Sequence, residues 1–263
     1  MKRIGVFDSG LGGLTVLNEI CKYNQNLELV YFGDTARVPY GSRTVDTISH
    51  YAEQDVRFLL SKDVEAIVIA CGTVSAIGLN ALRNKFSVPI FGVIEAACEK
   101  AVKESHTRRI AVLGTKATIR SHAYLKTIQT LSDDCRVTEI ACPLLVPLIE
   151  NGFSEDDPIT ELTLKHYLDP LMESDVDTVI LGCTHYPYLD RAISNLLPFA
   201  KTINIGTALS KALKNLLPLD EGSKQNRISY YVSDPDTDFQ SIANGSLDVI
   251  KAESIITVNI ENY

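Results

Sequence analysis

Val64-Glu65-Ala66-Ile67-Val68-Ile69-Ala70-Cys71-Gly72-Thr73 is the stretch that decides the fold. It is a short apolar run that ends in a cysteine and is followed by a glycine and a hydroxyl group. Continuous apolar residues are typical of parallel strands that are buried on both faces. In open α/β sheets, active sites lie beyond the carboxyl ends of such strands. The stretch therefore predicts a buried parallel strand with Cys71 at the functional edge of a sheet.

The same pattern occurs again at residues 176–185, where the apolar run ends at Cys183. Residues 2–10 and 108–116 also resemble one another, and the two pairs are separated by similar offsets of 112 and 106 positions. Any two buried strands are rich in Val and Ile and can look alike. Two similar pairs in the same order favour duplicated domains, because a period this long does not indicate a solenoid.

Strands and helices are expected to alternate along most of the chain, which predicts an α/β fold with parallel sheets. Its two domains would be residues 1–95 plus 207–263 and residues 96–206. Besides the two cysteine-ending strands, the expected strands are 3–7, 27–32, 90–94, one beginning at Ile110, 137–141, 202–205, 228–232 and 254–258. The expected helices are 14–23, 44–60, 75–84, 159–172, 206–217 and 236–243, and residues 220–226 are the clearest loop.

Composition narrows the class of protein. The 263 residues are 45% hydrophobic and 22% charged, which is typical of a globular protein, and the net charge of −8 argues against a nucleic-acid partner. No apolar run reaches the roughly 18 residues that a membrane helix needs, so no membrane partner is expected. Because the N-terminus leads directly into a strand, we expect no signal peptide and a cytoplasmic protein with reduced cysteines. The six cysteines form no CxxC pair, and we expect no metal.

Two loops beyond the expected strands carry polar groups. Asp8-Ser9-Gly10-Leu11-Gly12-Gly13 contains three glycines that leave backbone N–H groups available to an anion, but it does not match a nucleotide-binding fingerprint. Residues 33–41 form a longer loop that ends in Pro39-Tyr40-Gly41. That tripeptide fits an ordinary turn and a functional loop equally well.

Three kinds of chemistry fit Cys71 and Cys183. One cysteine could be a covalent nucleophile with His185 as its base. The pair could instead form a redox disulfide, or act as two acid–base groups on opposite faces of one substrate. Symmetric placement at the ends of equivalent strands favours two acid–base groups, because inversion of a stereocentre needs two bases. The remaining cysteines are expected to be small buried hydrophobic residues: Cys21, Cys98, Cys135 and Cys142.

Several other candidates have an ordinary structural explanation. Asp8 and Glu150 could be surface or capping carboxylates, although Asp8 in its glycine loop is the stronger functional candidate. His185 could be a buried structural histidine. Thr115, Thr118 and Ser121 could cap the helix that follows them.

The chain resembles glutamate racemases of the cofactor-independent aspartate/glutamate racemase superfamily. The motifs that carry the resemblance run through most of the chain: Gly5-Val6-Phe7-Asp8-Ser9-Gly10 with Gly12-Gly13, then residues 31–41, 92–95, 114–119, 146–150 and 181–187. The resemblance implies two pseudo-symmetric parallel-sheet α/β domains facing across an active-site cleft. It also implies interconversion of L- and D-glutamate without a cofactor, to supply D-glutamate for peptidoglycan. A homodimer is left open.

The resemblance also implies roles for individual residues. Cys71 and Cys183 would be the two bases, and Asp8, Glu150 and His185 would tune or orient them. The residues expected to hold the substrate are Asp8, Ser9, Tyr40, Gly41, Gly72, Thr73, Thr118, Thr184 and His185.

The chain departs from the family at two places. The usual Cys-Asn-Thr is Cys71-Gly72-Thr73, so an amide that would bind the substrate is missing; a water in the vacated space or the Gly72 N–H could replace it. The usual Asp-Ser-Gly is Asn204-Ile205-Gly206. Two alternatives follow: a racemase for aspartate or another amino acid, and a non-catalytic binding module. Retention of both cysteines argues against the module.

Overall fold

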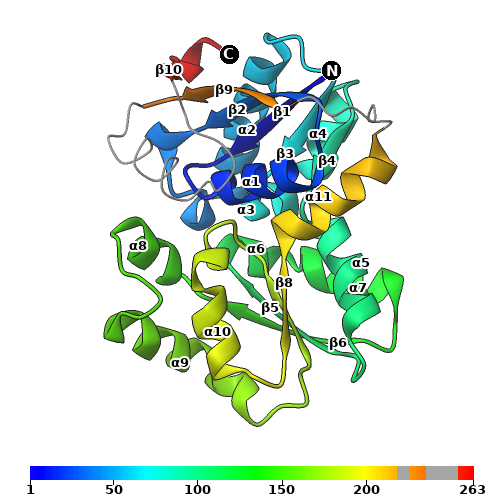
Figure 1. The fold of residues 1–263 in the computed structure, drawn as a ribbon, viewed down its shortest axis with the longest axis vertical. Coiled ribbons are helices and arrows are strands. Elements are labelled where there is room, and N and C mark those ends of the chain that lie inside the picture. Colours follow the sequence, from blue (N-terminus) through cyan, green and yellow to red (C-terminus); the bar gives the residue numbers. More distant parts are fainter. Residues whose placement is uncertain (218–224, 235–253) are drawn as a thin grey trace.

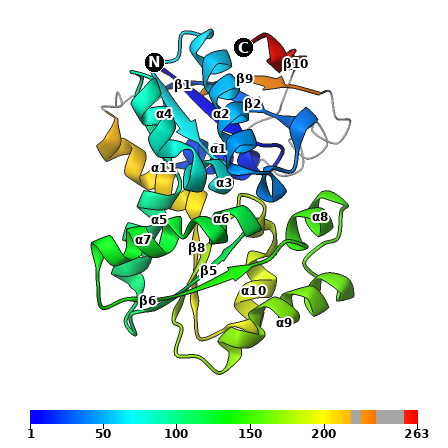
Figure 2. The ribbon, with the colours of Figure 1, turned by 180° about the vertical axis from the view of Figure 1, so that it is seen from behind.

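The computed structural model describes residues 1–217, 225–234 and 254–263. It contains two parallel β-sheets with helices around them, one above the other in Figures 1 and 2. The expected helix at 236–243 lies outside the described residues, as does most of the expected loop at 220–226. Among the described residues, no helix is long and apolar enough to cross a membrane.

The first sheet has six strands in the order β10-β9-β2-β1-β3-β4. The strands of residues 1–95 form its centre and one edge: β1 (Lys2–Asp8), β2 (Leu27–Gly33), β3 (Ala66–Ile69) and β4 (Ile90–Gly92). The tail adds β9 (Arg227–Val232) beside β2, and then β10 (Ile255–Thr257). We call this sheet with its helices the first lobe.

The second sheet has four strands in the order β6-β5-β7-β8. They are β5 (Arg109–Gly114), β6 (Arg136–Ala141), β7 (Thr178–Leu181) and β8 (Lys201–Asn204), and with their helices they form the second lobe. This order matches β2-β1-β3-β4 strand for strand. The register matches too, since Ile4 lies opposite Ala66 and Ile110 lies opposite Thr178. The duplicated, pseudo-symmetric arrangement is confirmed, while the domain limits 95/96 and 206/207 stay a prediction.

The helices have the following bounds: α1 (Gly13–Tyr23), η1 (Thr35–Arg37), η2 (Tyr40–Ser42), α2 (Val45–Leu60), α3 (Gly72–Ile77), α4 (Leu79–Lys85), α5 (Ile94–Glu104), α6 (Lys116–Ser121), α7 (Ala123–Leu131), α8 (Leu145–Glu150), α9 (Pro158–Met172), η3 (Tyr186–Leu189), α10 (Asp190–Leu196), α11 (Ile205–Leu216) and η4 (Ile260–Asn262). The expected helix at 75–84 is two helices that meet at Gly78. The expected strand at 90–94 is shorter, because Ile94 already begins α5.

Alternate residues of each strand face different cores. One core lies between the sheets and includes Ile4 and Val6 of β1 together with Ile110 and Val112 of β5. Helices α1, α5, α7 and α11 contribute to it, and α11 packs against both α1 and α5. The outer faces have cores of their own, built with α2 on the first lobe and with α9 and α10 on the second. The lobes are therefore joined by a continuous apolar core behind their facing edges.

Candidate active site

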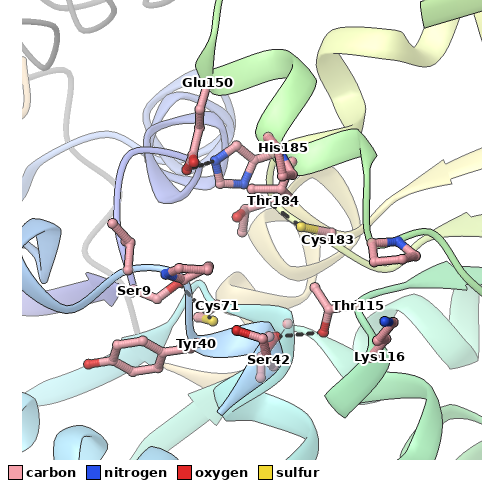
Figure 3. A pocket seen from close by; sticks show the side chains of 18 of the residues that line it. Ser9, Tyr40, Ser42, Cys71, Thr115, Lys116, Glu150, Cys183, Thr184 and His185 are labelled. Atoms are coloured by element: carbon pink, nitrogen blue, oxygen red, sulfur yellow. Dashed lines mark hydrogen bonds and ion pairs between the residues drawn. The ribbon is translucent and has the colours of Figure 1, made fainter. Parts of the chain in front are cut away.

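A cavity of about 310 Å³ lies between the lobes at the carboxyl ends of their strands. Cys71 follows β3 and Cys183 follows β7, so the equivalent strands bring one cysteine each to the same cavity. Figure 3 shows the two side chains on opposite sides of it. Both are free thiols, only 4% and 6% exposed. The structure thus contains no disulfide between them.

A histidine and a carboxylate extend from the Cys183 side. His185 Nδ1 lies 3.8 Å from Cys183 Sγ, and its Nε2 lies 3.0 Å from Oε1 of Glu150. Burial alone would lower the pKa of His185, but the contacts with Cys183 and Glu150 outweigh it and raise that pKa to about 10. The imidazole is therefore protonated at neutral pH and can exchange a proton with the sulfur.

The Cys71 side has a different environment. Its Sγ lies 3.4 Å from Ser9 Oγ. Burial, with the nearby Asp8 carboxylate, raises the pKa of Cys71 to about 12, so the sulfur carries its proton at neutral pH. Asp8 is itself fully buried behind the cavity wall, and burial raises its pKa as well. It accepts the Gly10 N–H at 3.0 Å and the Thr184 hydroxyl at 3.5 Å. Asp8 therefore does not line the cavity itself, and its carboxylate contacts a residue that does, Thr184.

Three threonine hydroxyls meet where the lobes touch. Thr73, of the first lobe, lies 3.0 Å from Thr115 and 3.4 Å from Thr118, both of the second lobe. Thr115 also caps α6 by accepting the Thr118 N–H. Thr73 and Thr115 line the cavity, whereas Thr118 is fully buried behind them.

Tyr40 lines the cavity with its ring, but its hydroxyl donates to Asp34 and lies 3.2 Å from Asp55. Arg37 joins the same buried group, with Nε 2.6 Å from Asp34 and Nη2 3.0 Å from Asp55. Figure 3 shows the Tyr40 hydroxyl pointing away from Cys71. The phenol therefore fixes the loop that bears Gly41 and does not offer its oxygen to a ligand.

The position of Gly72 corrects one expectation. We expected space for a water where the family has an amide side chain. A Cβ built at Gly72 would instead overlap the carbonyl oxygen of Gly182, just before Cys183. The backbones of the two lobes meet at this point, and the space is filled.

Asn204 and Ile205 have structural roles. The Asn204 side chain caps α11 by accepting the N–H groups of Gly206 and Thr207 at 2.8 and 3.1 Å. Ile205 is fully buried in the core that lies between the two sheets.

The remaining predicted residues line the cavity: Ser9, Gly41, Thr184, His185 and Glu150. Sequence reasoning missed Ser42 and Lys116, and it assigned Cys142 only a core role although that residue also lines the cavity. Cys142 directly follows the end of β6, and Lys116 lies two positions after the end of β5, which was the available signal. Among the described residues, no group of three or more His, Cys, Asp or Glu side chains is arranged to hold a metal ion.

The fold and the site define a two-lobed α/β protein with one free cysteine from each lobe at a shared cavity. The family described as Asp/Glu/Hydantoin racemase matches residues 10–209 of the chain. The chain belongs to this family, and it is an amino-acid racemase, an isomerase.

Individual relatives agree with this assignment. The glutamate racemase of Sulfurihydrogenibium sp. (strain YO3AOP1) is 41% identical over 254 residues, which cover 96% of this chain and 96% of that protein. The glutamate racemase of Aquifex aeolicus (strain VF5) is 45% identical over 221 residues, which cover 84% of this chain and 85% of that protein. The crystal structure of glutamate racemase from Francisella tularensis subsp. tularensis SCHU S4 in complex with D-glutamate has a TM-score of 0.91 and 34% identity, covering 100% of this chain and 99% of that one.

Proposed function

We propose that this protein interconverts L- and D-glutamate by moving the α-proton between Cys71 and Cys183, without a cofactor. The observation that carries the mechanism is the placement of both free thiols in one cavity, at the ends of equivalent strands β3 and β7. The relatives that the chain matches along most of its length are glutamate racemases, and this supports glutamate as the substrate. We propose further that the D-glutamate serves peptidoglycan synthesis in the cytoplasm, where free thiols persist.

The chemical steps follow from the two thiols. A thiolate on one side takes the α-proton, which breaks the Cα–H bond and leaves its electron pair on the α-carbon. The thiol on the other side then donates its proton to the opposite face of that carbon. The configuration is inverted, and the thiolate has moved from one cysteine to the other. Each base must lie within hydrogen-bond reach of the α-carbon's proton in the bound state.

The surroundings of the sulfurs support an unequal pair at rest. Cys71, whose pKa is raised to about 12, is the thiol, ready to donate. The protonated His185, held by Glu150, lies beside Cys183 and can donate a proton there and then take it back. Once Cys71 has donated its proton, the thiolate must exist in the less favourable surroundings of Cys71. The Ser9 hydroxyl, 3.4 Å away, is the neighbour placed to stabilise that charge.

Incubation with L-glutamate in D2O, with no cofactor added, tests the proposal. Optical rotation should fall to zero while the NMR signal of the α-proton disappears, because the returning proton comes from exchanged thiols. L-Aspartate serves as the comparison substrate. Turnover of aspartate with none of glutamate would contradict the assigned substrate, and racemisation with retention of the α-proton would contradict the two-thiol mechanism.

A further inference from the structure

A second cavity, of about 460 Å³, lies beside the catalytic one. It also spans both lobes, because its lining comes from the loop after η2 and the start of α2 on one side and from α6 on the other. Gly41, Ser42 and Lys116 line both cavities. A molecule bound in the second cavity would therefore contact both lobes at the edge of the active site.

Positive charge is concentrated in this second cavity. Arg43, Lys116 and Arg120 line it, all three are exposed, and no acidic residue is part of the lining. None of the three forms an ion pair or side-chain hydrogen bond with the part of the chain that the structure describes. Asp46 is close in sequence to Arg43 but does not line the cavity. Six other arginines have carboxylate partners, as expected in a chain of net charge −8: Arg3, Arg37, Arg83, Arg108, Arg109 and Arg191.

These charges face one another across the junction of the lobes. Arg43 belongs to the first lobe, while Lys116 and Arg120 belong to the second, so their repulsion opposes close approach of the lobes. An anion bound between them would attract the cationic side chains of both lobes, so that attraction replaces the repulsion. Arginine guanidinium groups bind planar and tetrahedral oxyanions through paired N–H donors, and the Ser42 hydroxyl adds a further donor.

We propose that this second cavity is a binding site for a small oxyanion, of the phosphate or carboxylate class, which bridges the two lobes beside the active site. Its volume accommodates such an anion together with several of its waters, since one water takes about 30 Å³ of liquid volume. The proposal concerns binding alone and does not depend on the reaction that the cysteines carry out.

Isothermal titration with inorganic phosphate, at an ionic strength held constant with chloride, tests the site. We expect saturable binding of one phosphate per chain. Arg43→Gln and Arg120→Gln should each weaken it about two- to fivefold, as for an exposed charge contact, and the double variant about tenfold. Lys103→Gln, which removes an exposed charge outside the cavity, is the matched control. Lys116 is left unchanged because it also lines the catalytic cavity.

Competition by glutarate, which has no α-amino group and cannot be racemised, separates the two ligand classes. Displacement of phosphate by glutarate in the wild type supports a site that takes carboxylates as well. If glutarate does not displace phosphate from the wild type, while the double variant binds phosphate about tenfold more weakly, the result supports a site for phosphate-type anions. Phosphate binding that the double variant leaves unchanged, or that Lys103→Gln weakens equally, overturns the proposal.

Discussion

Gly72 lies where the backbones of the two lobes meet, so that adding even one carbon atom at this position would disturb the contact between the lobes. A Cβ at this position would overlap the Gly182 carbonyl, which belongs to the segment that bears Cys183. Backbone cannot move aside cheaply, so Gly72→Ala and Gly72→Asn should push the two cysteines apart. We expect kcat/KM to fall about 10- to 100-fold in both variants, because small displacements of reacting groups have effects of this order. Steady-state kinetics with L- and D-glutamate measures it.

Gly78→Ala provides the control for this prediction. A Cβ at Gly78 would make only ordinary contacts, the nearest at 3.4 Å to the Val74 carbonyl oxygen. Its kcat/KM should stay close to that of the wild type. A Gly72→Asn protein with a lower KM and an unchanged kcat would instead mean that the lobes accommodate the amide and that it binds the substrate.

At the scale of elements, α11 depends on a side-chain cap at its start. Asn204 Oδ1 accepts two N–H groups of the first turn, and the helix packs against α1 and α5. Asn204→Ala should lower the free energy of unfolding by about 1 kcal/mol, whereas Asn204→Asp, which also caps, should retain most of it. Urea denaturation followed by circular dichroism measures both. Equal stability of all three proteins would show that the cap contributes nothing.

Elements with a strong local pattern were predictable from the sequence, and those that depend on tertiary contacts were not. Residues 66–69 and 179–181 are apolar throughout, and they make up β3 and most of β7. The break between α3 and α4 at Gly78 was not predicted, because an isolated glycine does not by itself end a helix. Helix α8 was also missed, since Pro147 within it and its short length obscure any helical period.

The same distinction holds within the site. The cysteines could be predicted as a pair because each follows an apolar run of the same kind in the sequence. The direction of the Tyr40 hydroxyl could not, because it is set by contacts with Asp34 and Asp55, whose side chains meet Tyr40 only in the folded protein and do not line the cavity. The overlap at Gly72 likewise depends on a residue 110 positions away in the sequence.

At the scale of the whole molecule, two similar lobes face one another and close tightly around the cavity. Three glycines of the first lobe allow this approach: a Cβ at Gly12 would overlap Thr184 and His185, one at Gly41 would crowd Thr115, and one at Gly72 would meet Gly182. The pseudo-symmetry of the sheets then places one sulfur on each side of a shared cavity. This opposed placement of two thiols is what the proposed two-base reaction at a stereocentre requires.

The central claim is that each cysteine serves one face of the substrate, and elimination of HX from β-substituted glutamates tests it most directly. Elimination needs one base only: the thiolate takes the α-proton, the Cβ–X bond breaks, and no reprotonation by the second cysteine is required. Cys71→Ala and Cys183→Ala should both lose racemisation, yet each should still eliminate HX from one α-configuration, and the two configurations should be opposite. Elimination by both variants from the same configuration, or complete loss with both, would contradict the account.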